Sequence, residues 1–564
     1  MTSKRMCWLL AGVCFLTFAA SINYPFLGCQ DDWAYVTANR HLQAGWSHIV
    51  QLATTPVLGL STPLPQISYL VDHSIAGMEP WIYHLINILW HCGMVLLVFR
   101  LFRELGIRRN AAFFTALIFA IHPQRVESVV WISERKDVMC GFFFILSCVC
   151  YMAYRRPRRP ASAVYQWGSI AAMAAALASK PSAAALPFVL LALDFHRTEK
   201  FHWKPLIGHF TVLAGYLLLS QTLLSGTGKN ISNMGLRPVL GLRNYCTYFL
   251  KTFYPSEVCP LYPYINLSPA DIILIGLCIA ALIWFIARFR KKAVYDVLPM
   301  LFCAGIVLAP VCGIIIFSSA DFADRYSYIP SVFFLAAAAL ILPPIPEKFR
   351  KWTFCIPVLL LIRTWLYLPA WNGDGPLLQA ACSVPDYNYR GAIIYAEVLT
   401  KQGKAQEGLE ILKHCGRNDP RTAREKILLD IADHLFALMA RYQAGEDPAK
   451  LFPEFTKILA PDKNRDLLQR VAYLSLLTIL PAHADCALAA GKPIAAADIY
   501  ATLARSYPDE PFTEAFYMGV SLMLRRNAAE AVKYFERALA ESPDDEPTKR
   551  NLENARRLAA GKQR

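Results

Sequence analysis

The chain has 564 residues, of which 55% are hydrophobic and only 18% charged, with a net charge of +15 and a mean hydropathy of +0.33. Soluble globular proteins are nearer half apolar and a quarter charged. The composition therefore excludes a single soluble domain, and the length allows two or more domains.

The apolar excess and the basic charge both belong to the first two-thirds of the chain. Apolar runs recur from Trp8 to Leu368, whereas residues 369–564 have the composition of ordinary soluble helices. The N-terminal part holds 31 Lys and Arg against 16 Asp and Glu, and the C-terminal part holds 26 of each. A tail without a basic face argues against a nucleic-acid partner. We expect a transmembrane domain over 1–368 and a separate helical domain over 369–564.

The apolar segments predict about 11 membrane-spanning helices. A helix needs roughly 20 apolar residues to cross a bilayer, and fewer where the bilayer thins locally. Some of the segments are short, which is tolerated in helices that end beside a polar cavity. The first segment lacks a small-x-small cleavage site, so we expect a retained helix rather than a signal peptide. The predicted spans are 6–27, 81–102, 110–122, 137–154, 166–179, 182–195, 206–225, 270–288, 296–317, 330–342 and 352–368.

Basic residues are divided unevenly between alternate loops. One set of loops holds 20 of the 31 Lys and Arg with about 5 acidic residues, and the other set holds 11 of each sign. The positive-inside rule places the first set, which includes Lys4 and Arg5, in the cytoplasm. Eleven spans then put the N-terminus in the cytoplasm and the C-terminal domain outside it; in a bacterium the membrane would be the inner or plasma membrane.

An acidic pair, Asp31-Asp32, directly follows the first predicted span. Such residues often cap a helix. A carboxylate at the boundary between water and lipid is also what a general base for a hydroxyl acceptor needs.

A polar stripe runs along the second predicted span. His84, Asn87 and His91 share one helix face, which must point into the bundle. Hydrogen bonding between helices is the simpler explanation, and contact with a metal or substrate is the alternative.

A dense charged segment follows the third predicted span. It begins at His122, includes Glu127, and continues through Ser133-Glu-Arg135-Lys-Asp137. Apolar residues separate its two halves, so we expect an interfacial helix that holds the charges at the membrane surface, although a plain surface loop has the same composition.

Two further cations stand between predicted spans. Lys180-Pro181 splits the apolar stretch 167–195, and Asp324-Arg325-Tyr326-Ser-Tyr328 separates two later spans. An arginine fork framed by tyrosines suits a lipid phosphate. Snorkelling of the cation toward lipid headgroups is the alternative.

Most of the sixteen cysteines lie in apolar runs, where they act as small hydrophobic residues. Cys246 and Cys259 fall in one predicted external loop, where they form either a disulfide or two free thiols.

The C-terminal domain shows a 34-residue period typical of tetratricopeptide (TPR) repeats. The clearest unit, 512–545, has Gly519, Ala531 and Phe535 at the positions where small and aromatic residues let two helices pack closely. Stacked units bury a core that no single unit could bury. The predicted units are 389–422, 430–463, 477–510 and 512–545, with a capping helix over 546–560; an unrelated helical bundle is the alternative.

Taken in order, these motifs resemble those of the C-type (GT-C) polyprenyl-phosphate-sugar glycosyltransferases, and in particular the TPR-containing transmembrane O-mannosyltransferases and their bacterial homologues. The resemblance covers nearly the whole chain. It rests on the acidic pair, the stretch from Pro63 to His91, the second charged loop, the lysine between short helices and the late Asp-Arg-Tyr motif. The chain departs from the family at Thr62-Pro63 and Lys180-Pro181, which puts donor specificity in doubt more than the reaction.

The resemblance implies transfer of a sugar, with mannose as the candidate, from a polyprenyl-phosphate donor to a hydroxyl acceptor on the outer membrane face, with protein Ser/Thr as the expected acceptor. Asp31 is the preferred base and Asp32 an orienting residue. The implied donor-phosphate residues are Arg325, Lys180, Arg135, Tyr326 and Tyr328. The candidates for acceptor or metal contact are Glu127, Asp137, His122, His84, His91 and Asp324.

The resemblance leaves the cofactor open, with Mg²⁺ or Mn²⁺ as the candidates because carboxylate oxygens suit hard cations. The expected partners are the lipid-linked donor, membrane lipids and a protein or peptide held by the TPR domain. The alternatives are a non-catalytic TPR membrane scaffold, a glycan polymerase or ligase, and a transporter.

Overall fold

The computed structural model describes most of the chain, and its elements in the described part are helices joined by turns and loops. The described residues are 2–156, 162–224, 237–263, 267–312, 322–342, 352–383, 388–415, 423–459, 479–506 and 511–561. Within these ranges the only β-type pairing is an isolated bridge between Val57 and Leu60. The predicted all-α class is thus confirmed.

The chain divides into two compact units, Met1–Ala380 and Ala381–Arg564. The segment after the last apolar helix belongs to the first unit because its side chains pack there. Trp371 is 1% exposed and packs against Trp131, and Asp374 accepts a hydrogen bond from the Cys29 amide over 3.1 Å.

Four helical stretches of the first unit have the length and composition to cross a membrane. They are Ser3–Asn23, formed by α1 (Ser3–Phe18) and a following 3₁₀ turn, then α5 (Pro80–Glu104), Ile132–Tyr154, which contains α8 (Arg135–Tyr154), and α13 (Pro269–Arg288). We therefore describe the chain as an integral membrane protein. The figure of about 11 spans remains a prediction.

The other predicted spans correspond to shorter helices. These are α6 (Arg109–Ile121), α9 (Ser162–Ser179), α10 (Leu186–Thr198), α11 (Ile207–Leu224), α15 (Leu298–Leu308), α16 (Pro330–Ile341) and α17 (Cys355–Tyr367). Lys180 has extended backbone angles between α9 and a 3₁₀ turn, so the chain does break at Lys180-Pro181.

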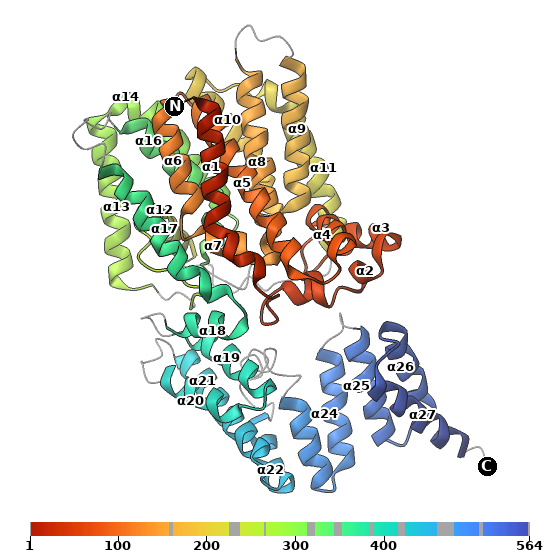
Figure 1. Cartoon of the computed structure of the whole chain (residues 1–564). Helices are drawn as coiled ribbons and strands as arrows, with labels where there is room; N and C mark the ends of the chain where they lie inside the picture. Colours follow the sequence, from red (N-terminus) through yellow and green to blue (C-terminus); the bar gives the residue numbers. More distant parts are fainter. Residues whose placement is uncertain are drawn as a thin grey trace. The chain divides into compact units, whose positions relative to one another are not determined.

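The long helices pack side by side, as Figure 1 shows for α1, α5, α8 and α9. Small residues permit the close approach. A Cβ added to Gly93 on α5 would lie 2.8 Å from the Phe142 ring, and one added to Gly141 on α8 would lie 2.6 Å from the Tyr328 ring. Gly141 thereby leaves room for a tyrosine of the late Asp-Arg-Tyr motif.

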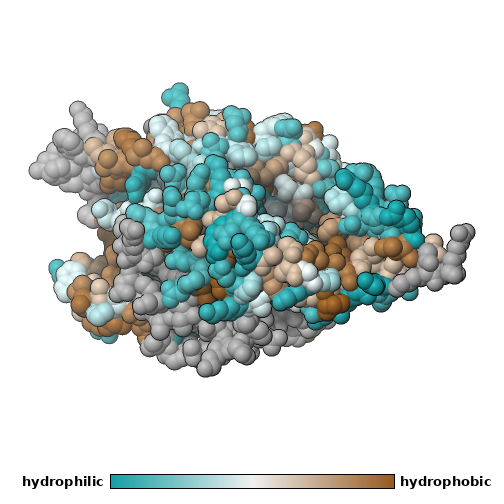
Figure 2. Space-filling model, turned by 90° about the horizontal axis from the view of Figure 1, so that it is seen from below, coloured by the Kyte–Doolittle hydropathy of each residue, from teal (hydrophilic) through white to brown (hydrophobic). Residues whose placement is uncertain are grey.

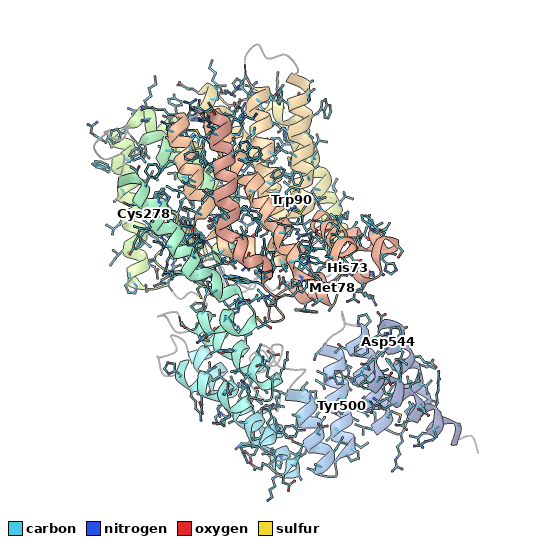
Figure 3. All side chains as sticks on the ribbon, viewed as in Figure 1. His73, Met78, Trp90, Cys278, Tyr500 and Asp544 are labelled. Atoms are coloured by element: carbon cyan, nitrogen blue, oxygen red, sulfur yellow. The ribbon has the colours of Figure 1, made fainter. Side chains whose placement is uncertain are left out.

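Two helices lie where loops were predicted. The first, α4 (Pro63–Ala76), precedes α5; in Figure 3, His73 and Met78 mark its end and the turn that follows. The second, α12 (Arg237–Phe253), is amphipathic and packs against α13 and α16. Cys246 therefore lies on a helix rather than in a loop, and Cys246 and Cys259 are buried free thiols.

The second unit consists of consecutive helices in which neighbours in sequence pack together. Glycines with positive φ, Gly403, Gly445 and Gly491, lie in three of the turns between helices. The side of the molecule seen in Figure 2 mixes hydrophilic and hydrophobic residues. The helices are α19 (Tyr389–Lys401), α20 (Ala405–Cys415), α21 (Ala423–Gln443), α22 (Pro448–Leu459), a helix over Ile479–Ala489, α24 (Pro493–Ser506), α25 (Pro511–Leu524), α26 (Ala528–Glu541) and α27 (Glu546–Gly561).

Two helices overlap each of the four predicted 34-residue units, although α21 begins at Ala423, before the unit 430–463, and α27 falls on the predicted cap. Parts of these units, including 416–422, 460–478 and 507–510, lie outside the described residues. The TPR class of the pairs stays a prediction.

Candidate active site

The acidic pair divides into one buried and one accessible carboxylate. Asp32 is 1% exposed, and its two oxygens accept hydrogen bonds from the amides of Leu27 (3.0 Å) and Ser133 (2.8 Å). Burial raises the pKa of Asp32 to about 6, against the opposing effect of those amides. The Asp31 side chain is 38% exposed and so remains available to an acceptor.

Lys136 holds the accessible carboxylate. Its ammonium nitrogen lies 3.6 Å from Asp31 Oδ2 and 3.0 Å from Glu134 Oε1, and it donates to the Ser133 carbonyl over 3.1 Å. The rings of Tyr35 and Trp131 pack around this buried cation. Lys136 thus joins Asp31 to a second acidic residue.

That second acidic residue, Glu134, lies among three cations. Its side chain is 1% exposed, and besides Lys136 it contacts Arg325 Nε at 3.5 Å and Lys180 Nζ at 3.8 Å. These cations come from α8, from the break after α9 and from the 3₁₀ turn Asp324–Ser327, which are far apart in sequence. The turn is held to α7 (Arg125–Val130) by hydrogen bonds between Arg125 and Ser327.

Arg325 and Lys180 are each paired with a further carboxylate. Arg325 donates to Glu127 through its guanidinium and, over 2.8 Å, through its backbone amide. Lys180 forms an ion pair with Asp137. Burial opposes the charge of Lys180, but the carboxylates of Asp137 and Glu134 outweigh it and raise the pKa of Lys180. Both cations therefore stay charged.

Both cations open onto one recess, a cavity of about 20 Å³ with an open mouth. The polar part of its lining comprises Asp137, Lys180, Ser182, Arg325, Tyr326 and Tyr328. The apolar part comprises Val307, Val311, Ile329 and Pro330. Cations beside an apolar wall suit an anion attached to a hydrocarbon chain, because the anion finds charge-assisted hydrogen bonds and the chain finds apolar surface.

Arg135 is not among these cations, contrary to expectation. It is buried and bonded to Asp72, to Asn87 Oδ1 at 2.7 Å and to the Tyr83 carbonyl at 2.7 Å. These partners belong to α4 and α5. The side chains of successive residues on a helix point in different directions. Arg135 therefore anchors α8 to α4 and α5, whereas Lys136 reaches Asp31.

The histidines of the polar stripe have structural contacts. His91 Nδ1 meets the Tyr328 hydroxyl at 2.8 Å and its Nε2 meets the Ala120 carbonyl at 3.1 Å, while His84 Nε2 meets the Tyr24 carbonyl at 3.1 Å. These contacts match the simpler explanation, hydrogen bonding between segments. His122 is buried, and its Nδ1 accepts a hydrogen bond from the Gln124 amide over 3.3 Å.

Asp324 supports the Arg325 turn from behind. It accepts hydrogen bonds from Tyr262 (2.8 Å) and Gln124 (3.3 Å), and Lys251 of α12 lies 3.0 Å away. Asp324 is fully buried, so it positions its neighbour rather than contacting a ligand in the recess.

The described residues contain no group of three or more His, Cys, Asp or Glu side chains arranged to hold a metal ion. Glu127 and Asp137, two of the candidates for acceptor or metal contact, are each paired with a cation. The site as described does not fit Mg²⁺ or Mn²⁺.

Glu134 and Lys136 were not expected as functional residues, although they stand in the charged run before Asp137. Their position in the sequence could have predicted this role. A carboxylate and an ammonium group in a segment flanked by apolar residues need partners of opposite charge. Lys251 was missed because α12 was not predicted.

Comparison with known proteins supports the resemblance drawn from the motifs. The chain is 28% identical over 227 residues to the protein O-mannosyl-transferase TMTC2 of Mus musculus, covering 37% of this chain and 27% of that protein. It is 31% identical over 148 residues to tmtc2 of Xenopus laevis (25% of this chain, 18% of that protein). It is 32% identical over 172 residues to Tmtc1 of Drosophila melanogaster (28% and 19%).

The chain thus spans about a quarter or less of the length of these curated relatives. No protein-family model matches it. Among solved structures, ArnT from Cupriavidus metallidurans bound to undecaprenyl phosphate superposes with a TM-score of 0.37 and 14% identity, covering 89% of this chain and 81% of that chain.

Proposed function

We propose that this chain is a membrane glycosyltransferase of the GT-C type, which moves a sugar from a polyprenyl-phosphate donor to an acceptor hydroxyl. The observation that carries the proposal is the recess in which Lys180 and Arg325 lie beside an apolar wall. The names of the sequence relatives, protein O-mannosyl-transferases, support a protein Ser/Thr acceptor and mannose as the sugar.

In the proposed reaction the donor phosphate binds to Arg325 and Lys180 with its isoprenoid chain along the apolar wall. The acceptor oxygen forms a bond to the anomeric carbon, and the bond from that carbon to the phosphate oxygen breaks. The hydroxyl proton passes to Asp31, and the electron pair leaves with the polyprenyl phosphate. The cations stabilise the growing phosphate charge, which is the usual source of the largest rate gain in such transfers.

The ion pairs seen in the structure support these roles, with Asp31 as the base and Arg325 and Lys180 as the cations that bind phosphate. Asp31 is accessible and held by Lys136, whereas Asp32 accepts two backbone hydrogen bonds and fixes the loop. Glu127 and Asp137 hold the cations when no phosphate is bound. The charge asymmetry of the loops supports a reaction on the extracytoplasmic side, with the second unit presenting the protein acceptor there.

The test compares the glycans on exported proteins from cells with and without the gene, by mass spectrometry of Ser/Thr peptides. We expect one hexose modification to disappear with the gene and to return with the wild-type gene. Restoration by an Asp31→Asn, Arg325→Ala double variant would contradict the proposal and favour the scaffold alternative.

A further inference from the structure

Glu134 is the one carboxylate described in the site that contacts cations of both its halves. On the donor side it contacts Arg325 and Lys180, which line the recess. On the acceptor side it contacts Lys136, whose ammonium reaches Asp31. The remaining carboxylates contact cations on one side only, Glu127 with Arg325 and Asp137 with Lys180.

Because Glu134 is buried, its carboxylate and the three cations around it depend on one another for their positions. Burying a carboxylate without partners is costly, so a carboxylate that is 1% exposed holds its cations in place and is held by them. Displacing Glu134 would remove one ionic partner from Lys136 and one from Arg325 at the same time. The same negative charge also repels an anion that approaches Arg325 and Lys180, so it opposes donor binding while it orders the site.

We infer that Glu134 is a positioning residue, which sets the place of the base relative to the donor phosphate at the expense of donor affinity. The inference rests on the proposed function. It assigns Glu134 a role distinct from those of Glu127 and Asp137, which hold one cation each. Its role acts through Lys136 on Asp31 and through Arg325 and Lys180 on the donor.

This role predicts two effects of opposite sign in one variant. Glu134→Gln keeps the size of the side chain and removes its negative charge. Loss of the negative charge should tighten donor binding by about tenfold, the effect of one screened unit charge. Without the ionic contact to Glu134, Lys136 and the Asp31 carboxylate that it contacts should shift. A misplacement of about 1 Å lowers kcat by about 10²-fold. Substitution of a residue that only stabilises the fold would weaken donor binding and lower kcat.

The experiment uses the full-length protein in detergent. Binding is measured with undecaprenyl phosphate, and transfer is measured as sugar added to a Ser/Thr-rich peptide from a lipid extract of the native host. The matched control is Glu104→Gln. Glu104 is also a buried carboxylate between two arginines, Arg100 and Arg156, but it lies at the last residue of α5, away from the recess. The control should change neither donor binding nor kcat.

Tighter binding with a lower kcat in Glu134→Gln supports the inference. Weaker binding, or an unchanged kcat, overturns it while leaving the proposed function intact. If Glu134→Gln does not fold, Glu134→Asp decides, because it keeps the charge and shortens the side chain: kcat should fall while donor binding stays at the wild-type level, and an unchanged kcat overturns the inference. If the wild type binds no undecaprenyl phosphate and transfers no sugar, the proposed function fails as well.

Discussion

The carboxylate of Asp31 lies 3.6 Å from the ammonium nitrogen of Lys136, and the two residues come from segments separated by six α-helices, α2 to α7. This contact fixes an accessible carboxylate without burying it. We therefore predict that Asp31→Asn lowers the transfer rate by about 10²–10⁴-fold, because the amide cannot accept a proton. Donor binding should be unchanged, since the base touches the acceptor. Both are measured on the purified protein with undecaprenyl phosphate and a Ser/Thr peptide.

The control for this prediction is Asp32→Asn. Its side chain accepts from two backbone amides, and an amide side chain supplies only one acceptor atom. This variant should lower thermal stability, by about 1–3 kcal/mol for one unsatisfied buried amide. If Asp32→Asn keeps its stability yet loses transfer, the two aspartates have exchanged roles.

A second prediction concerns the two cations of the recess. Arg325→Ala and Lys180→Ala should each weaken binding of undecaprenyl phosphate and lower transfer, with a loss of roughly 3–4 kcal/mol of transition-state stabilisation for Arg325, by analogy with a lost oxyanion donor. Arg135→Gln is the contrast, because it leaves Asp72 buried and unpaired, which costs about 3–5 kcal/mol of stability. Equal donor affinity in Arg325→Ala and wild type would contradict the assignment.

The sequence predicted the elements better than the contacts. Apolar runs are long and periodic, so the ends of α5, α6, α9 and α13 fall within a few residues of the predicted spans. The amphipathic α12 was missed because its mixture of Arg243, Lys251 and apolar residues has no long apolar run. Its buried face becomes visible only when α13 and α16 pack against it.

The candidate site was predicted as a set of residue types rather than as an arrangement. Asp31, Lys180 and Arg325 were named, and the structure joins them through Glu134 and Lys136. Arg135 and Lys136 are adjacent cations in one charged run, and nothing in the sequence tells which of them faces Asp31. The two side chains leave the start of α8 in different directions. As a result Arg135 pairs with Asp72, and Lys136 contacts Asp31.

A third prediction is a pH dependence of donor binding. Burial raises the pKa of Glu127 to about 7, against the opposing effect of Arg325. The pKa lies above its ordinary value, so Glu127 becomes neutral as the pH falls through about 7. A neutral Glu127 no longer competes with the phosphodiester for Arg325, and donor binding should tighten as the pH falls from 8 to 6.

The groups that act on Glu127 are Arg325 and Asp324 of the 3₁₀ turn, so the control must leave that turn intact. Glu127→Gln does so, because the side chain keeps its size and an acceptor for the Arg325 amide. The phosphate monoester of undecaprenyl phosphate itself titrates at about pH 6, and it does so equally in measurements on both proteins. The ratio of wild-type to variant affinity should therefore rise as the pH falls from 8 to 6. A ratio that is flat over this range would count against this account of Glu127.

A fourth prediction concerns topology. The loops that include Lys4 and Arg5 hold most of the basic charge of the first unit, so the N-terminus should lie in the cytoplasm and the C-terminus outside it. A reporter that is active only in the cytoplasm should be inactive when fused after Arg564 and active when fused before Met1. Activity at the C-terminal fusion would place the second unit in the cytoplasm and remove it from the proposed acceptor side.

The last prediction concerns the second unit, where α25 and α26 meet at Gly519 and Phe535. A Cβ added to Gly519 would lie 2.7 Å from the Phe535 ring, and both Phe535 and Ala531 are fully buried beneath it. Gly519→Val should destabilise the pair by about 1–3 kcal/mol, since the overpacked contact must open. Ala540→Val, at an exposed position of α26, should cost below about 0.7 kcal/mol, which is the loss of helix propensity alone. Urea unfolding of the fragment 381–564, followed by circular dichroism, measures both. The fragment should unfold cooperatively, and the two variants should differ in midpoint; equal midpoints would show that α25 and α26 do not pack through this contact.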